Sequence, residues 1–224
     1  MSLLYEIGKE QGAFRVIKFN NYQIYEQYLE EYRGLELNFL EISDKTSQEF
    51  DWYMWQNYFP RKGDFYAVNL SQGKVLRKLP DSIIKFSGEE LDMFDLRADS
   101  NFFDVIIIQV KETLQLELFQ KVWPKLKIGG ILFVENIDYK KDKCKKIIDI
   151  FAYLRDKKNK FEDNCNIISK DFMDTLKLEV GESIIWWNKN VPSVGILKKI
   201  ERPLEIKETV KNVKKENEIK TLIQ

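Results

Sequence analysis

The sequence predicts an α/β fold with a doubly wound, mainly parallel sheet that ends in an antiparallel hairpin. Short apolar runs alternate along the chain with segments whose apolar residues recur at helical spacing. FDVIIIQV (103–110) contains three consecutive isoleucines, as expected of a parallel strand that is buried on both faces. ESIIWWN (182–188) and SVGILKKI (193–200) flank NKNVP, whose proline and asparagines favour a hairpin turn.

The first half of the chain is predicted to alternate helices and strands. In NYQIYEQYLEEYR (21–33), four tyrosines and a leucine recur at helical spacing. A second helix over 44–60 carries Trp52 and Trp55 and is stopped by Pro60. Apolar runs predict the strands of this half over 37–42, 64–70 and, more weakly, 82–88.

The second half continues the alternation. After the strand over 103–110 we expect a helix over 113–126, a strand over 129–137 and a lysine-rich helix over 140–161. The end of the chain has no aromatic residue and many charges, which is typical of a frayed helix or a disordered extension. We therefore expect three parts: a helical lead-in over 1–36, an α/β domain over 37–203 and a charged tail over 204–224.

Composition excludes several classes of protein. The 36 basic and 36 acidic residues balance, so the bulk positive charge of a nucleic-acid-binding protein is absent. No apolar run is long enough for a membrane span, and MSLLYEIGKE lacks the charged-then-apolar order of a signal peptide. Cys144 and Cys165 do not make a disulfide framework, so we expect a reducing, cytoplasmic setting.

The chain contains no histidine. Its absence excludes Ser–His and Cys–His nucleophile pairs, histidine-ligated zinc and imidazole general bases. Two cysteines are also too few for an ordinary closed zinc site. Acid–base chemistry would have to use carboxylates, lysines or tyrosines.

Several segments resemble a known family. FDVIII, a helix and WPKLKIGGILFVENI resemble the second half of a class I S-adenosylmethionine-dependent methyltransferase, and more closely the macrocin-type sugar O-methyltransferases. NYQIYEQYLEEYRGLELNFLEI resembles that family's tyrosine-rich lead helix and first strand, and MWQNYFP with FYAVNL resembles its first helix and second strand. The resemblance covers residues 5–200. It implies a Rossmann-like methyltransferase fold with a seven-stranded mixed sheet, S-adenosylmethionine as cofactor, and a small-molecule or glycan substrate.

The resemblance also implies where the cofactor would bind, since ligands of open α/β sheets lie outside the carboxyl ends of the strands. Ser43 stands where the family has the first glycine of its cofactor loop, and Asn69 stands where it has an acid that accepts from the ribose. Gln109 ends a third strand at the same edge. Glu41 could contact the amino or sulfonium end of the cofactor, or it could simply bond to backbone N–H groups.

The family's catalytic and metal positions are also altered. Gln109 and Glu112 occupy the places of an aspartate and a histidine, and Glu135-Asn136 replaces an acidic pair. Mg²⁺ prefers anionic oxygens, so we expect no metal site. The catalytic candidates are Glu112, Lys111 and Gln109, with Glu135 a further candidate base. Lys111 and Glu112 could equally be solvated loop residues, since a lysine needs burial to titrate near neutrality.

Two functional hypotheses therefore remain. The chain could be an enzyme that moves a methyl group to a sugar hydroxyl, with impaired or altered catalysis. Alternatively, it could be a pseudoenzyme, a non-catalytic binding or scaffolding protein with a protein partner or a second copy of itself. In the second case, we expect side chains such as Lys45 or Gln48 to fill the crevice near Ser43.

Several other residues could have either a structural or a functional role. Trp52 and Trp55 fit a helix face packed on the sheet better than a stacking platform for adenine. Trp186 and Trp187 point to opposite faces of a strand, so one belongs to the core and the other lies on a second covered face or contacts a partner. The lysine-rich helix over 140–160 could attract an anionic substrate or partner, or be a solvated outer face.

Overall fold

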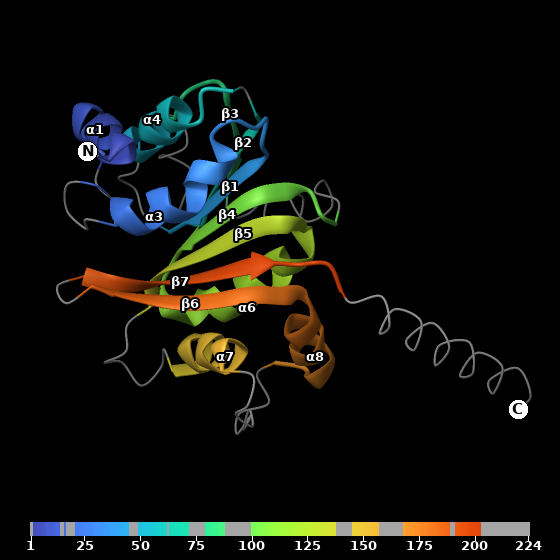
Figure 1. Ribbon diagram of the computed structural model, residues 1–224. Coiled ribbons are helices and arrows are strands. Elements are labelled where there is room, and N and C mark those ends of the chain that lie inside the picture. The colour runs from blue at the N-terminus through green and yellow to red at the C-terminus, as the bar shows by residue number, and fades with distance from the viewer. Residues whose placement is uncertain are drawn as a thin grey trace, which may run out of the picture.

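The computed structural model describes residues 2–13, 16, 21–44, 49–61, 63–71, 79–87, 100–137, 145–156, 168–188 and 191–202. A seven-stranded sheet with the strand order β3-β2-β1-β4-β5-β7-β6 forms the centre of this part of the chain (Figure 1). Its strands are β1 (Phe39–Ser43), β2 (Phe65–Asn69), β3 (Ile83–Ser87), β4 (Phe103–Gln109), β5 (Leu126–Ile137), β6 (Val180–Asn188) and β7 (Val191–Lys199).

The sheet is mixed, as predicted. Strands β1 to β5 pair in parallel with their neighbours, whereas β7 is antiparallel to both β5 and β6. The chain starts in the middle of the sheet with β1, moves outward to β3, and returns to the other side of β1 with β4. This return creates the switch point at which doubly wound sheets bind ligands. The predicted fold class and the C-terminal hairpin are confirmed.

Helices cover both faces of the sheet (Figure 1). On one face lie α1 (Leu3–Glu10), α3 (Tyr22–Leu29) and α4 (Glu49–Tyr58), and on the other lie α6 (Glu112–Val122), α7 (Lys145–Arg155) and α8 (Lys170–Glu179). Alternate residues of β4 belong to different cores. Val105 and Ile107 pack toward α1, α3 and α4, whereas Ile106 and Ile108 pack toward α6, α7 and α8. The run of isoleucines is thus explained by burial on both faces.

The core beneath α3 and α4 is rich in aromatic rings. Trp52 and Trp55 are 3% and 0% exposed, so the prediction that they belong to the core is confirmed. Burying such a side chain stabilises the fold by roughly 1.5–3 kcal/mol. The two tryptophans of β6 differ, because Trp186 packs against this core while Trp187 is 51% exposed.

The boundary between α6 and β5 was predicted wrongly, and β6 and β7 each start two residues earlier than predicted. The helix expected to reach residue 126 ends at Val122, and a short 3-10 helix, η4 (Trp123–Lys125), contains Pro124. Strand β5 then starts at Leu126, three residues earlier than expected. Gly129 has a φ of +81°, and a Cβ on Gly130 would lie 2.9 Å from the backbone oxygen of Asp104. The Gly-Gly pair therefore allows β5 to bend and approach β4 closely.

No bounds were predicted for two helices, α8 and α1, of which α1 falls within the helical lead-in predicted over 1–36. Ser169 caps α8 by accepting a hydrogen bond from the backbone N–H of Phe172, and Ser2 caps α1 in the same way. A serine followed by apolar residues at helical spacing is the signal that could have revealed both helices. In α8 the apolar positions are Met173 and Leu176, which are buried.

The remaining helices differ in length from the predictions. α3 ends at Leu29 and continues as a 3-10 helix, η1 (Glu30–Tyr32), rather than running to residue 33. α4 starts at Glu49, and residues 45–48 of its predicted range lie outside the described residues. The lysine-rich helix is described as α7, while the rest of its range and the tail lie outside the described residues. Within the described part of the chain, every helix is too short or too polar to span a membrane.

Candidate functional site

Four polar side chains form a row at the carboxyl edge of the parallel strands. Ser43, the last residue of β1, pairs with Asn69 of β2 on one side and with Gln109 of β4 on the other. The register of β4 against β5 pairs Ile108 with Val134, which brings Gln109 beside Glu135. Because side chains alternate along a strand, the four share the face that packs against α3 and α4.

Glu135 is the centre of a buried hydrogen-bond network. Its carboxylate accepts one hydrogen bond from the hydroxyl of Tyr25 on α3 and one of 2.5 Å from Nε2 of Gln109. From the opposite helix layer, Nε2 of Gln115 on α6 donates to the backbone oxygens of Glu135 at 2.8 Å and Val110 at 3.2 Å. Glu135 is only 2% exposed. The network therefore ties both helix layers to the strand ends.

The same network leaves two buried amide oxygens without a partner among the described residues. These atoms are Oε1 of Gln109 and Oε1 of Gln115, and their residues are 1% and 0% exposed. A buried acceptor without a hydrogen bond costs free energy, so such atoms usually bond to water or to a ligand. Oε1 of Gln109 is thus an acceptor at the strand ends for a donor that the described residues do not supply.

Asn69, the predicted ribose acceptor, uses its side-chain oxygen locally. Oδ1 accepts hydrogen bonds from the backbone N–H of Ser71 at 2.8 Å and from its hydroxyl at 2.6 Å. An amide oxygen has two lone pairs, and this turn occupies both. A ribose hydroxyl could be accepted by Asn69 only if the turn at Ser71 rearranged.

Two of the predicted cofactor contacts are deeply buried. Ser43 is 5% exposed, and its backbone oxygen accepts from Leu70 N–H at 2.8 Å. Glu41 is 1% exposed and lies two residues before the end of β1, between Ala67 and Ile107. Glu41 therefore sits beneath the edge of the sheet rather than at the strand end. The cofactor contacts assigned to both residues stay predictions.

Lys111 and Glu112 lie just beyond the row, where the chain leaves β4 and enters α6. Lys111 is exposed, and its backbone N–H donates to Oδ2 of Asp44 at 2.9 Å. Glu112 is half-buried and is the first residue of α6. Of the three catalytic candidates, only Gln109 belongs to the network around Glu135, and the catalytic roles of all three stay predictions.

The residues at the strand ends do not fit a Mg²⁺ site. Octahedral Mg²⁺ requires several free oxygen ligands, whereas both carboxylate oxygens of Glu135 accept hydrogen bonds from Tyr25 and Gln109. Asn136, which stands where the resemblance implies an acid, has a φ of +60°. Asparagine tolerates this left-handed conformation better than most residues. Within the described residues, no three carboxylates or cysteines converge as a metal cluster would need.

Two members of the network were missed by the sequence analysis. Tyr25 was assigned only to a tyrosine-rich helix, and its contact with Glu135 spans 110 residues of sequence. Gln115 left a clearer signal. It stands at a buried position of the α6 stripe that continues with Leu118, Phe119 and Val122. Lys45 and Gln48, expected to fill the crevice of a scaffold, lie outside the described residues.

Comparisons with known proteins show similarity in structure but not in sequence. No family model and no curated protein matches the chain. The MycE methyltransferase of the mycinamycin biosynthetic pathway, solved with Mg and SAH, has a TM-score of 0.62 at 16% identity, and the match covers 88% of this chain and 55% of MycE. The O-methyltransferase TomG from Streptomyces achromogenes, solved with SAM, has a TM-score of 0.50 at 12% identity over 88% of this chain and 90% of its own.

A third solved structure, an O-methyltransferase from Bacillus cereus in complex with SAH, has a TM-score of 0.51 at 13% identity. That match covers 90% of this chain and 91% of the Bacillus protein. Together the likenesses show that the chain has the Rossmann-like fold of class I methyltransferases. The chain spans about half the length of MycE.

Proposed function

We propose that the chain is a methyltransferase-like protein that binds S-adenosylmethionine at the carboxyl edge of its sheet and methylates a hydroxyl group of a small molecule, with altered catalysis. The observation that carries this proposal is the row of polar strand ends with the unpartnered Oε1 of Gln109. MycE and TomG, solved with SAH and SAM, support the choice of cofactor. A glycan acceptor and a cytoplasmic setting follow only from the resemblance and the composition.

The chain's own residues would mainly bind and orient. The cofactor supplies an electrophilic methyl group on a sulfonium. Oε1 of Gln109 would accept a hydrogen bond from a donor of the bound ligand, while its Nε2 stays on Glu135. Tyr25 and Gln115 hold Glu135 by hydrogen bonds from the two helix layers, so its position would be set before any ligand enters. Preorganisation of this kind can supply a large part of a methyl transfer's acceleration.

Proton removal from the acceptor hydroxyl is the altered step. The amide of Gln109 cannot take up a proton at neutral pH, so it is a positioning residue. Both oxygens of Glu135 already accept hydrogen bonds. Lys111 and Glu112, at the start of α6, are the candidates that remain. A missing or poorly placed base would cost about 10²–10⁴-fold in rate.

A second candidate function is that of a non-catalytic binding or scaffolding protein. It is favoured by the turn in which Oδ1 of Asn69 already bonds twice to Ser71, because the ribose would then lack its acceptor. The exposed Trp187 could contact a protein partner or a second copy in that case. The two candidates differ in whether the cofactor binds at all.

The test is a calorimetric titration with S-adenosylmethionine, followed by a methyl-transfer assay with sugar and polyol acceptors. We expect saturable binding, a raised Tm because the ligand binds the folded state, and slow methyl transfer. Asn69→Asp, which restores a charged acceptor, should tighten binding about tenfold, as one added charge-assisted hydrogen bond would. Asn57→Asp makes the same change on the exposed end of α4 and should leave affinity unchanged.

Each outcome has a distinct meaning. Binding with slow transfer supports the proposal. Binding without transfer to any acceptor would favour a protein that uses the cofactor only as a ligand. No binding to folded wild type or to Asn69→Asp would contradict the proposal and leave the scaffolding function.

A further inference from the structure

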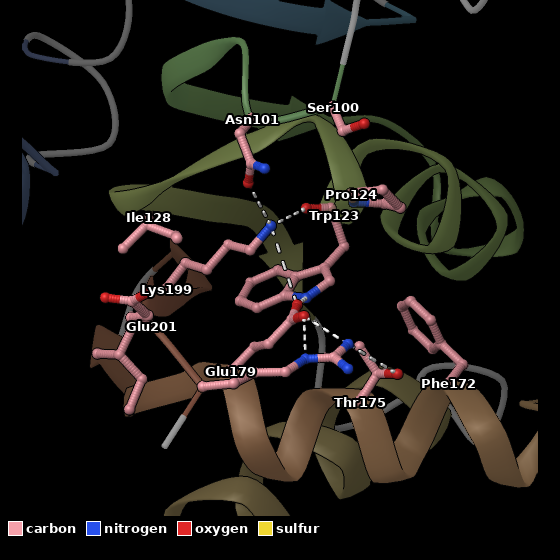
Figure 2. Close-up of a pocket in the computed structure, with 12 residues that line it drawn as sticks. Ser100, Asn101, Trp123, Pro124, Ile128, Phe172, Thr175, Glu179, Lys199 and Glu201 are labelled. Atoms are coloured by element: carbon pink, nitrogen blue, oxygen red, sulfur yellow. Dashed lines mark hydrogen bonds and ion pairs between the residues drawn. The ribbon is translucent and has the colours of Figure 1, made fainter. Parts of the chain in front are cut away.

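A pocket lies at the edge of the sheet opposite the polar strand ends, where β4 and β5 begin and β7 ends (Figure 2). Its volume is about 450 Å³, within the range of small-molecule sites. The pocket is formed between the turns that precede β4 and β5, the α8 helix and the residues after β7. It lies at the far ends of the strands from Gln109 and Glu135, so the methyltransferase fold assigns it no role.

Lys199 forms the floor of this pocket. Lys199 is 4% exposed. Its ammonium donates to the backbone oxygen of Trp123 and to Oδ1 of Asn101, both at 3.2 Å (Figure 2). It also donates to the backbone oxygen of Leu126 at 2.8 Å. These acceptors use all three of its N–H groups. Lys199 is therefore a structural cation that leaves its charge, but no free donor, beneath the pocket.

Two cations share one carboxylate here. Oε1 of Glu179 lies 2.7 Å from both Nε and Nη2 of Arg202. Its other oxygen, Oε2, accepts a hydrogen bond from the indole N–H of Trp123 at 2.9 Å. Oε2 also lies 3.9 Å from Nζ of Lys199. The group of Lys199, Arg202 and Glu179 thus carries one surplus positive charge, and Glu201, which also lines the pocket, balances it over the lining as a whole. Burial lowers the pKa of Lys199. The negative charge of Glu179 acts in the opposite direction and raises this pKa, whereas repulsion from Arg202 lowers it further. An anion in the pocket would relieve this repulsion.

Arg202 presents a free edge to such an anion. Nε and Nη2 of Arg202 face Glu179. The other edge of the guanidinium is formed by its two terminal nitrogens. Among the described residues, its nearest further partner is Oγ1 of Thr175, which lies 3.5 Å from Nη2. The side chain of Arg202 is 35% exposed. The amide nitrogen of Asn101 is a further donor, because only its oxygen is used by Lys199. A planar carboxylate matches a guanidinium edge in a bidentate way.

Part of the pocket wall is apolar. Phe172 and Pro124 line it, together with Ile128 and Ile200, which are 54% and 40% exposed. Exposed isoleucines beside a concave surface are the kind of apolar area that a ligand can cover. The pocket therefore combines an end with free guanidinium and amide donors and an apolar area that a ligand could cover.

We propose that this pocket binds a small organic carboxylate with an aromatic or aliphatic body. The carboxylate lies against the free edge of Arg202 and the amide of Asn101, and the apolar body lies against Phe172, Ile128 and Ile200. The site is independent of the carboxyl edge, so it can exist whether or not the cofactor binds there.

The test is a calorimetric titration of the full chain with naphthylacetate and with the uncharged isostere naphthylacetamide. We expect naphthylacetate to bind at least about tenfold more tightly than the amide, as one charge-assisted contact would allow. Arg202→Gln should weaken naphthylacetate binding by a similar factor, and Arg202→Lys, which keeps the charge but not the planar edge, should fall between. The control is Lys177→Gln. Lys177 is an exposed cation on α8, the helix that lines the pocket, and it pairs with Asp174 outside the pocket.

Several results would overturn the proposal. It fails if neither probe binds, if acid and amide bind alike, or if Arg202→Gln binds the acid as wild type does. It also fails if Lys177→Gln weakens binding as much as Arg202→Gln, since the effect would then be one of overall charge. Should Arg202→Gln not fold, as judged by circular dichroism, Arg202→Lys decides, and unchanged affinity in that variant counts against the bidentate contact.

Discussion

The two edges of the sheet bury opposite charges in opposite ways. At the carboxyl edge, the anion Glu135 is held by neutral donors, the Tyr25 hydroxyl and the Gln109 amide, and amide oxygens are left over. At the amino edge, the cation Lys199 is held mainly by neutral acceptors, and guanidinium donors of Arg202 are left over. One edge therefore offers acceptors to a ligand and the other offers donors, so we expect the two edges to bind different ligands.

The largest effect is expected at the amino edge. Lys199→Met removes a buried cation and leaves three acceptors and Glu179 less well paired, so unfolding free energy should fall by about 4 kcal/mol. Lys198→Met is the matched control, because this neighbour has a side chain 33% exposed and an ion pair with Glu31 at the surface. That change should cost less than about 1 kcal/mol. Urea unfolding measures both, and equal losses would contradict the assignment of Lys199 as a structural cation.

Glu135 should show the next largest effect. Glu135→Ala removes the hydrogen bonds that the carboxylate accepts from the Tyr25 hydroxyl and the Gln109 amide and should cost about 3 kcal/mol. Glu135→Gln should cost only about 1 kcal/mol, because the Gln109 amide can turn its unpartnered oxygen toward the new NH₂ group. Chemical unfolding distinguishes the two. If the two variants lost the same stability, the hydrogen bonds from Tyr25 and Gln109 would not be what holds Glu135.

Two tyrosines one turn apart on α3 provide a finer comparison. Tyr25→Phe removes a buried hydrogen bond to Glu135 but keeps the ring, which packs 4.8 Å from Phe133, and should cost about 1.5 kcal/mol. Tyr28→Phe removes a 3.2 Å hydrogen bond to the exposed Glu182 and should cost less than about 0.5 kcal/mol. The difference between the two losses, measured in urea, reports the burial of the network. A larger loss of stability in Tyr28→Phe than in Tyr25→Phe would contradict the burial of the Tyr25–Glu135 hydrogen bond.

The smallest effect concerns alkaline pH. Burial, reinforced by Glu182, raises the pKa of Tyr28 from 10.0 to about 12. Because the folded-state value is above the unfolded one, the contribution of Tyr28 to stability is full below pH 10 and is lost between pH 10 and about 12. The stability difference between wild type and Tyr28→Phe should therefore be constant below pH 10 and change above it. A difference that stays flat to pH 12 would rule out the shift.

Much of the fold could be predicted from sequence because its signals are local. The isoleucine run of β4 and the proline and asparagines of the hairpin each act within a few residues. The row of strand-end residues also followed from the sequence, since parallel strands end at one edge. The helix boundary at Val122 was missed because Pro124 was read as part of a helix rather than of a terminal 3-10 turn.

The hydrogen bonds of both edges could not be predicted. Tyr25 and Glu135 are 110 residues apart, and Lys199 and Leu126 are 73 apart, so only the tertiary fold brings them together. The side-chain oxygen of Asn69 shows a different limit. Its acceptor capacity was recognised from its residue type, but whether a neighbour such as Ser71 already uses that capacity depends on the turn.

Calorimetric titration of the folded wild-type chain with S-adenosylmethionine tests this account at its base. We predict one saturable binding event, with a Kd of about 1 mM or tighter, which corresponds to at least about 4 kcal/mol of binding free energy. Binding should be unchanged in Arg202→Gln, since that residue lies at the other edge of the sheet. Absence of binding at concentrations well above that value, in a protein shown to be folded, would contradict the proposed function.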